Sequence, residues 1–450
     1  MYLITNGWIV TMDKQRNIYR NGALAIDGSR ITEVGETNAL KQKYPQAEII
    51  DATNKVVIPG LVNGHVHLFQ VLYRGLGDDL ALADWLSECI YRMSLNLTGN
   101  DVYHATLLAA TEMLKGGVTC YVDSHYINWD LSCQDKIAEA TVLSGIRGIM
   151  GRSTVDVAPV PEKLREAVDQ AIRESERIIK TYHNQADGLL KVRLEPLNEA
   201  LASTEMMLAM REVSRQYGVG MNMHMMEALP RVRTMTAKFG MTPVKYLYKL
   251  GILDSDLLLA HCCWVDDVDM DLIAETGAKV AHNPVSNQYL ADGVAPVPRM
   301  LEKGIVVTIG SDGACSNNNH DMFEAMKLTA LMHKVKNLDP EIMTAEKVLT
   351  MATIDAARAL GLEDEIGSLE AGKRADVVLV DIDHPSMTPC FNPVSNLVYA
   401  ATSNAVNTVL VNGRIVVQDR NLLTLDEEKV LHDANQAAWN LAEKSGAINQ

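Results

Sequence analysis

Cysteines at CxxC spacing are absent from this sequence. Seven of its 450 residues are cysteines, and none of them has the CxxC spacing of a zinc or redox motif. An odd number without such spacing indicates reduced thiols and a cytoplasmic protein rather than a disulfide framework. The seven are Cys89, Cys120, Cys133, Cys262, Cys263, Cys315 and Cys390.

Three further features are missing. No apolar run is long enough to cross a membrane, and residues 1–15 lack the basic segment and apolar segment of a signal peptide. Basic residues are outnumbered by acidic ones, 41 to 57, which gives a net charge of -16. This balance argues against nucleic acid or an anionic membrane surface as a partner. We see no internal repeat, and the composition is that of an ordinary globular protein.

Short apolar β-rich runs alternate with helical stretches through residues 58–362. Eight such runs with helical crossovers predict an α/β fold, a (β/α)8 barrel of the TIM type, rather than an open sheet. The strand candidates are residues 56–63, 117–124, 146–153, 191–196, 218–224, 256–261, 278–282 and 305–312.

The two ends of the chain differ in pattern from residues 58–362. Residues 1–57 and 363–450 contain short β runs, and we expect them to form one small β-sandwich domain beside the barrel. Asn-Gly or Asp-Gly pairs at 6–7, 27–28 and 412–413 predict tight hairpin turns. A helix is expected over residues 426–445, at the end of the sequence.

Histidines and an aspartate stand at the carboxyl ends of four predicted strands. His65 and His67 share one face of the first strand, because side chains alternate along a strand. His224, His261 and Asp312 end the fifth, sixth and eighth strands. Each alone is compatible with a core, capping or turn role. Together they predict a metal site for zinc, or for iron or manganese.

Three other polar residues follow predicted strands. Glu227 lies just past His224, either as a solvated loop acid or inside the pocket as a proton shuttle, which hydrolytic deamination requires. His282 ends the seventh strand and is a candidate pocket residue. Arg152, after the third strand, is either a contact to an anionic or carbonyl group or part of a surface salt bridge.

Six stretches together resemble the amidohydrolase superfamily, in its aminohydrolase and chlorohydrolase branch. Members of this branch include deaminases of S-adenosylhomocysteine and methylthioadenosine, guanine-type deaminases, and s-triazine hydrolases such as atrazine chlorohydrolase. The stretches span residues 59–86, 224–228, 260–264, 281–290, 310–327 and 351–381.

The resemblance implies roles for particular residues. Glu227, His261 and Asp312 are the implied catalytic residues, with His261 beside the water bound to the metal and the two acids moving protons. A single divalent metal is implied, most simply zinc, since Pro196 ends the fourth strand where some members carry a bridging lysine. The implied metal ligands are His65, His67, His224 and Asp312. The expected substrate contacts are Gln70, Trp85, Arg152 and His282.

We therefore predict a metal-dependent deaminase that releases ammonia from an aminated N-heterocycle: a purine or nucleoside, pterin, pyrimidine or s-triazine. Ser94 and Leu197 replace a glutamate and a histidine of the nucleoside deaminases, which weakens a nucleoside assignment. The alternatives are an s-triazine chlorohydrolase or N-dealkylating hydrolase, and a structural relative without catalysis. The resemblance also implies a homo-oligomer, a dimer or a tetramer.

Overall fold

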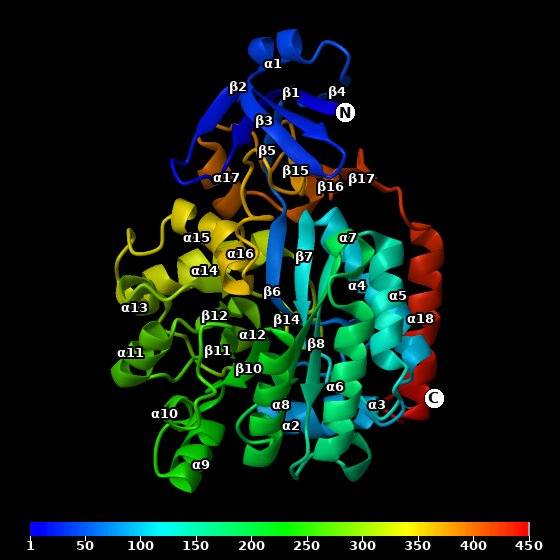
Figure 1. The fold of residues 1–450 in the computed structure, drawn as a ribbon, viewed down its shortest axis with the longest axis vertical. Helices are drawn as coiled ribbons and strands as arrows, with labels where there is room; N and C mark the ends of the chain where they lie inside the picture. The colour runs from blue at the N-terminus through cyan, green and yellow to red at the C-terminus, as the bar shows by residue number, and fades with distance from the viewer. Residues whose placement is uncertain (449–450) are drawn as a thin grey trace.

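The computed structural model describes residues 1–448, and all of the strands in this part of the chain belong to two nine-stranded sheets. One sheet lies above the other part of the molecule in Figure 1 and takes its strands from both terminal segments of the chain. The other is parallel and is surrounded by helices. The expected combination of a barrel and a small β domain is confirmed.

The parallel sheet closes on itself. β13 pairs with β12, β14 pairs with β6, and only Gly310 and Ser311 separate β13 from β14. These two short segments therefore act as one eighth strand, and all eight predicted strands are present. The barrel strands are β6 (Leu61–His67), β7 (Val118–Asp123), β8 (Arg147–Thr154), β9 (Leu190–Pro196), β10 (Met221–Met225), β11 (Leu257–His261), β12 (Lys279–His282), β13 (Val307–Ile309) and β14 (Asp312–Gly313).

Helices cover the outside of this barrel (Figure 1). The main ones are α4 (Gly99–Lys115), α5 (Cys133–Ser144), α6 (Val168–Tyr182), α8 (Thr204–Tyr217), α9 (Leu229–Phe239), α10 (Pro243–Lys249), α11 (Asp267–Thr276), α12 (Pro284–Tyr289), α13 (Val297–Glu302), α14 (Met322–Asn337), α15 (Ala345–Met351) and α16 (Ile354–Leu360). Four short helical segments join β6 to α4: η1 (Leu68–Tyr73), α2 (Leu82–Asp84), η2 (Trp85–Tyr91) and α3 (Arg92–Ser94). Two more, η3 (Glu162–Leu164) and α7 (Gln185–Gly188), flank α6.

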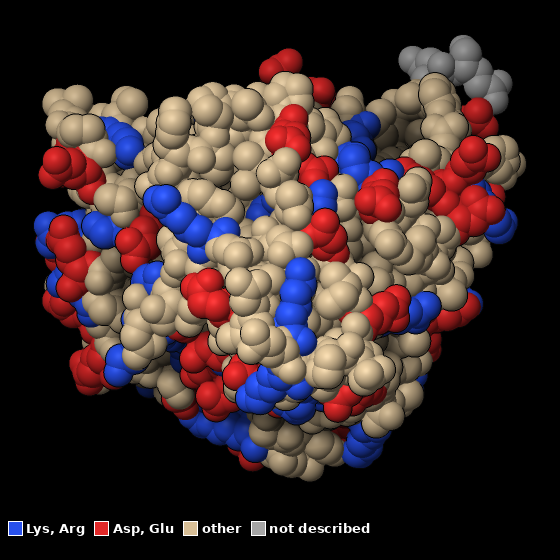
Figure 2. Space-filling view, turned by 90° about the horizontal axis from the view of Figure 1, so that it is seen from above, with Lys and Arg blue, Asp and Glu red and all other residues tan. Residues whose placement is uncertain are grey.

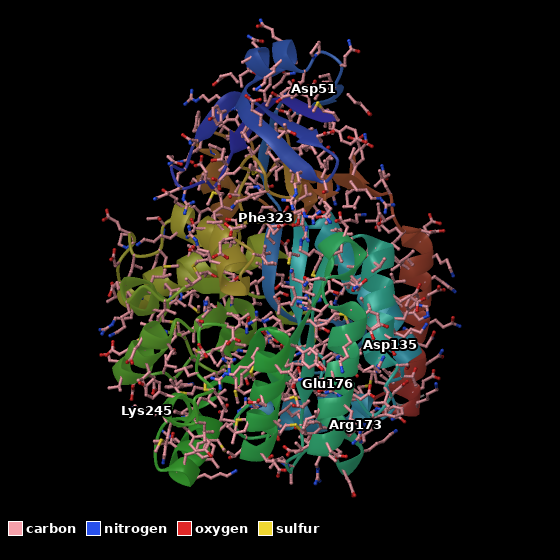
Figure 3. All side chains as sticks on the ribbon, viewed as in Figure 1. Asp51, Asp135, Arg173, Glu176, Lys245 and Phe323 are labelled. Atoms are coloured by element: carbon pink, nitrogen blue, oxygen red, sulfur yellow. The ribbon has the colours of Figure 1, made fainter. Side chains whose placement is uncertain are left out.

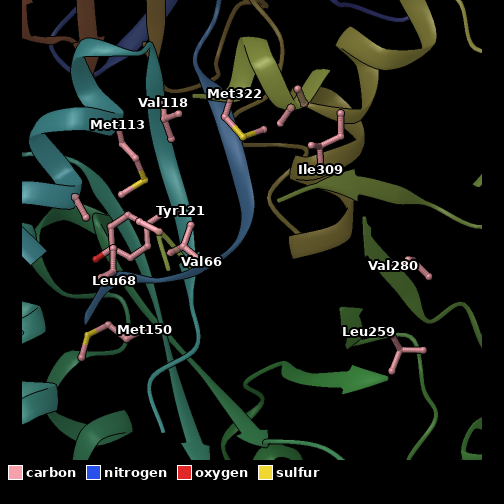
Figure 4. Close-up of a cluster of buried hydrophobic side chains, with 14 of the residues drawn as sticks. Val66, Leu68, Met113, Val118, Tyr121, Met150, Leu259, Val280, Ile309 and Met322 are labelled. Atoms are coloured by element: carbon pink, nitrogen blue, oxygen red, sulfur yellow. The ribbon is translucent and has the colours of Figure 1, made fainter. Parts of the chain in front are cut away.

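The core lies between the strands and these helices. Outward-facing strand residues such as Val66, Tyr121, Met150, Leu259 and Val280 fill this layer (Figure 4). Burial of apolar area here is the main stabilising term, at about 25 cal/mol per Å². On β10 the outward residues are methionines, and the intervening Asn222 and His224 are left for the lumen.

The second sheet runs in the order β18-β17-β16-β15-β5-β1-β2-β3, with β4 paired to β1. Its strands are β1 (Tyr2–Val10), β2 (Ile18–Asp27), β3 (Arg30–Glu36), β4 (Glu48–Asp51), β5 (Lys55–Pro59), β15 (Val377–Asp381), β16 (Val406–Val411), β17 (Arg414–Gln418) and β18 (Asn421–Leu422). α1 (Thr37–Lys43), α17 (Pro393–Tyr399) and η4 (Ser403–Ala405) belong to the same segments. On the face seen from this end, acidic and basic side chains are interspersed (Figure 2).

One expected hairpin is wrong. Asn6 and Gly7 lie inside β1, which continues through them, and Asn6 takes a φ of 65° at a register shift in the pairing with β2. The pair forms a bulge because β2 pairs with β1 on both sides of it. A Cβ on Gly7 would stand 2.9 Å from a Val57 methyl group, so a larger residue does not fit there. The turns at 27–28 and 412–413 do connect adjacent strands, as expected.

The domain limits remain a proposal, which the strand pairing refines. Ile58 and Pro59 pair with β15 of the terminal sheet, so we propose a division after Pro59 rather than after residue 57. The expected C-terminal helix is α18 (Glu427–Lys444), and it packs along α4 of the barrel (Figure 1). Among the described residues, no helix combines the length and the apolar character needed to cross a membrane.

A buried ion pair joins the barrel to the terminal sheet. Arg147, at the start of β8, donates to Asp376 with N–O distances of 3.1 and 3.2 Å, and both side chains are nearly inaccessible. We expect Arg147→Met to lower the free energy of unfolding by about 3–5 kcal/mol, because it leaves the Asp376 carboxylate buried without its partner. Denaturant unfolding followed by circular dichroism measures this.

The control is Arg173→Met. Arg173 pairs with Asp169 on the exposed face of α6 (Figure 3), and both side chains are about two-thirds exposed. Such pairs contribute less than about 1 kcal/mol. Equal losses in the two variants would contradict a structural role for the buried pair.

Candidate metal and substrate site

Barrel closure brings the predicted metal-binding residues together. His65 and His67 come from β6, His224 from β10, His261 from β11 and Asp312 from β14, and all five are buried. The His65 ring centroid lies 4.9 Å from that of His67 and 4.7 Å from that of His224. These strands run away from the terminal sheet in Figure 1, so the group lies at the opposite end of the barrel.

The distances between the polar atoms fit a small divalent ion. Nε2 of His224 lies 3.2 Å from Nε2 of His67, and Oδ1 of Asp312 lies 3.3 Å from His67 Nε2 and 3.5 Å from His65 Nε2. Ligands in a tetrahedron with metal–nitrogen bonds of 2.0–2.1 Å stand about 3.3–3.4 Å apart. Nε2 of His65 is buried without a hydrogen-bond partner in the protein. A bound cation would satisfy it, and the four side chains could hold one.

The other ring nitrogens are held by the protein. Nδ1 of His67 lies 2.6 Å from the Ser124 carbonyl oxygen, to which it can only donate. Nδ1 of His224 lies 3.0 Å from Oε1 of Glu195, which in turn accepts from Ser153. Both rings therefore turn Nε2 to the centre, as in metal sites where an outer carboxylate or carbonyl fixes the histidine. Glu195 was not predicted, although its inward position at the end of β9 was a usable signal.

Burial sets the protonation of this group. It lowers the pKa of His65 well below the usual value, with a further contribution from His224, and so favours the neutral ring that binds metals. Burial alone would raise the pKa of Asp312, but the surrounding histidines outweigh it and hold that pKa well below its usual range. His65 is therefore neutral and Asp312 ionised, whereas Glu195 outweighs the effect of burial at His224 and raises the pKa of that ring.

His261 stands at the edge of the group in a strained backbone conformation. Its φ is 74° and that of Asp312 is 62°, values that are uncommon outside glycine and that cluster at functional sites. The Asn287 amide nitrogen lies 2.8 Å from Nδ1 of His261. Since an amide N–H can only donate, the proton of the neutral ring lies on Nε2. That atom is 3.7 Å from Glu227 and 3.9 Å from Asp312.

Glu227 is inside the pocket, not in a solvated loop. Its side chain is 7% exposed, and it pairs with Arg231 one turn further along. Burial alone would raise the pKa of Glu227. His261, Arg231 and His224 together outweigh burial and hold this pKa below its usual range. Arg231 was not predicted; the spacing of four residues after Glu227 is the signal that would have identified it.

A cavity opens beside these residues. Its polar end comprises His67, His224, Glu227, Arg231 and Asp312, and the other walls are largely apolar. Trp85 lines the cavity as expected, with its indole nitrogen donating to the Cys315 carbonyl oxygen.

The other expected substrate contacts do not line this cavity. Arg152 is buried and donates to Glu166, so it belongs neither to the pocket wall nor to a surface salt bridge. His282 is buried 5.2 Å from the His333 ring. Gln70 donates to Tyr126 and lies against Gly313, where a Cβ would meet its carbonyl oxygen.

The profile of the amidohydrolase family matches residues 56–416, which include the whole barrel and part of the terminal sheet. The chain belongs to this family. It is 37% identical to a 5'-deoxyadenosine deaminase of Methanosarcina mazei, with 98% of each chain covered. It is 36% identical to a 5-methylthioadenosine/S-adenosylhomocysteine deaminase of Desulforamulus reducens, with coverages of 98% and 99%.

Two solved structures share the fold over almost the whole length. A zinc-bound adenosine deaminase from Xanthomonas campestris gives a TM-score of 0.93 at 28% identity, covering 98% of both chains. A zinc-bound atrazine chlorohydrolase from Arthrobacter aurescens gives 0.91 at 26% identity, covering 97% and 100%. The resemblance predicted from the sequence motifs is confirmed.

Replacing His65 tests the metal site. We expect His65→Ala to lose bound metal, because a tetrahedral site loses affinity when one of its four ligands is removed. Metal analysis of the purified protein measures the stoichiometry, with His432→Ala on the exposed face of α18 as the control. Retained stoichiometric metal in His65→Ala would remove His65 from the ligand set.

Glu195 provides a subtler test. We expect Glu195→Gln to weaken metal binding by about 10- to 100-fold without abolishing it, because an amide holds the His224 ring less firmly than a carboxylate does. Competition with a chromogenic chelator measures the dissociation constant. An unchanged constant would show that Glu195 does not support His224.

Proposed function

We propose that the protein is a metal-dependent hydrolase that removes an amino group from an aminated N-heterocycle and releases ammonia. The observation that carries this proposal is the placement of Glu227 and His261 at the same end of the cavity as the four metal-fitting side chains. The two deaminases of similar sequence support the reaction class, and their names favour a purine ring.

We assign His65, His67, His224 and Asp312 as the metal ligands. The zinc-bound solved relatives favour zinc, although the same donors accept iron or manganese. When bound, such an ion supplies Lewis-acid activation of water at neutral pH.

The remaining steps fall to residues of the chain. The Nε2–H of His261 orients the attacking water. Glu227, which its neighbours keep ionised, accepts one proton of this water and passes it to the ring nitrogen next to the carbon under attack. As the oxygen adds, this carbon becomes tetrahedral. Asp312 accepts the second proton and passes it to the amino nitrogen, whose bond to the carbon then breaks. The products are a ring carbonyl and ammonia, so the overall reaction consumes one water.

Arg231 acts on Glu227 rather than on the reacting atoms. Its guanidinium is paired with the carboxylate and is therefore a positioning group, which fixes the rotamer of Glu227 toward the cavity. Burial behind the apolar wall strengthens this pairing, because the local dielectric is low.

The similarity to atrazine chlorohydrolase favours a second candidate, displacement of chloride from an s-triazine by the same water. A chloride leaving group needs little protonation, so Glu227 would then have a smaller role. A structural protein without catalysis is disfavoured by the intact metal-fitting and proton-transfer residues. We also propose a cytoplasmic location and a homo-oligomeric state, a dimer or tetramer.

The test is ammonia release by the zinc-loaded protein on aminated purines, pterins, pyrimidines and s-triazines, with chloride measured on chlorotriazines. We expect ammonia from one ring class. Glu227→Gln should retain stoichiometric metal and lose at least about 100-fold in kcat, the typical contribution of general acid–base catalysis.

One outcome would contradict this function, and another would contradict the role of Glu227. Chloride release without ammonia would replace it with the chlorohydrolase reaction. Near-normal deamination by Glu227→Gln would show that another group moves the proton.

A further inference from the structure

Half of the residues that line the cavity are apolar, and they form a continuous wall away from the reacting end. It is built from the α2–η2 segment, from the loop after β8, from the loop after β9 and from the end of α12. The apolar lining residues are Leu82, Trp85, Leu86, Val155, Val160, Leu164, Leu197, Leu201 and Leu290. All of these contribute to the core or pack directly against it, so the wall is a fixed surface.

Except for the Tyr91 hydroxyl, the hydrogen-bond acceptors that line the cavity outside its reacting end are already engaged. Glu227 and Asp312 are its carboxylates, and both belong to the reacting end. Oδ1 of Asn198 accepts from the backbone N–H groups of Ala200 and Leu201. The Tyr126 hydroxyl accepts from Gln70, and the Ser316 hydroxyl lies 3.1 Å from that of Ser286. The Tyr91 hydroxyl is buried without a partner and offers a single polar atom.

A sugar does not suit such a wall. The vicinal hydroxyls of a ribose must both donate when they leave water, and each one left unpaired weakens binding. A hydroxyl forced into an apolar pocket is rejected by on the order of 100-fold relative to its apolar isostere. An alkyl group, by contrast, gains roughly fourfold for each methylene that it buries.

We propose that the substrate is an aminated N-heterocycle with an apolar, hydroxyl-free substituent, and that the wall selects this substituent over a ribose. The inference rests on the proposed function and narrows its substrate. It also separates this chain from the two similar deaminases, whose names specify nucleoside-type substrates.

Matched substrates test the selection directly. In the purine series, 9-cyclopentyladenine replaces the sugar of adenosine by a hydroxyl-free ring of similar size, and adenine is the parent. In the triazine series, N-isopropylmelamine is compared with its 1,3-dihydroxy derivative and with melamine. In whichever series releases ammonia, we expect kcat/KM for the apolar member to exceed that for the hydroxylated member by at least roughly 10-fold.

The wall itself is tested by Leu82→Gln and Leu86→Gln. These leucines are partly exposed, so the changes leave the buried core in place. We expect kcat/KM to fall by roughly 10-fold for the apolar substrate and by less than about twofold for the parent ring, because only the substituent loses apolar contact. Leu208→Gln, on the exposed face of α8, is the control and should leave both values unchanged.

The outcomes separate the two claims. Equal or better turnover of the hydroxylated members, with ammonia released, would overturn the inference and leave the deaminase function intact. A parallel fall for the parent ring and the apolar substrate in both wall variants would also overturn it. Absence of ammonia from all six compounds and from the wider panel would remove the proposed function, and the inference with it.

Discussion

The site depends on the closure of eight parallel strands into a barrel. Residues separated by as many as 247 positions, His65 and Asp312, meet because β14 hydrogen-bonds beside β6 and completes the ring. Parallel strands end at the same face, so each contributes a side chain to one small volume. The alternation of side chains then sends His65, His67, Asn222 and His224 inward while the methionines of β10 pack outward.

Placing so many polar groups in a dry interior is costly unless each has a partner. The structure provides a hydrogen-bonding or charged partner for most of these groups. Glu195 supports His224, the Ser124 carbonyl supports His67, and Arg231 supports Glu227. The buried nitrogen of His65 is left for a ligand. This arrangement explains why the group is rigid and why a cation fits it, since the surrounding hydrogen bonds already aim the donors at one point.

Substrate selection lies on different elements from the chemistry. The strands fix the reacting end, which suits any reaction that adds water to an electron-poor carbon. The α2–η2 segment and the loops after β8 and β9 form the wall, and loops vary more readily than strands. Similar enzymes can therefore share the reaction and differ in the ring substituent they accept, as the apolar wall here illustrates.

Local pattern in the sequence determined the strand order, the inward face of each strand and the histidines and acid at the strand ends. These patterns were enough to predict the barrel, the metal-site group and the place of Glu227. Alternation of side chains along each strand and parallel topology leave few other arrangements. Pairs that depend on packing could not be predicted. Arg152 pairs with Glu166 and does not line the pocket, and His282 packs against His333. Asn6-Gly7 forms a bulge because β2 pairs with β1 on both sides of it. Glu195 and Arg231 left a signal in the sequence, in strand position and in spacing from Glu227. Only the tertiary structure decided the apolar wall, since contacts between distant loops have no local signature.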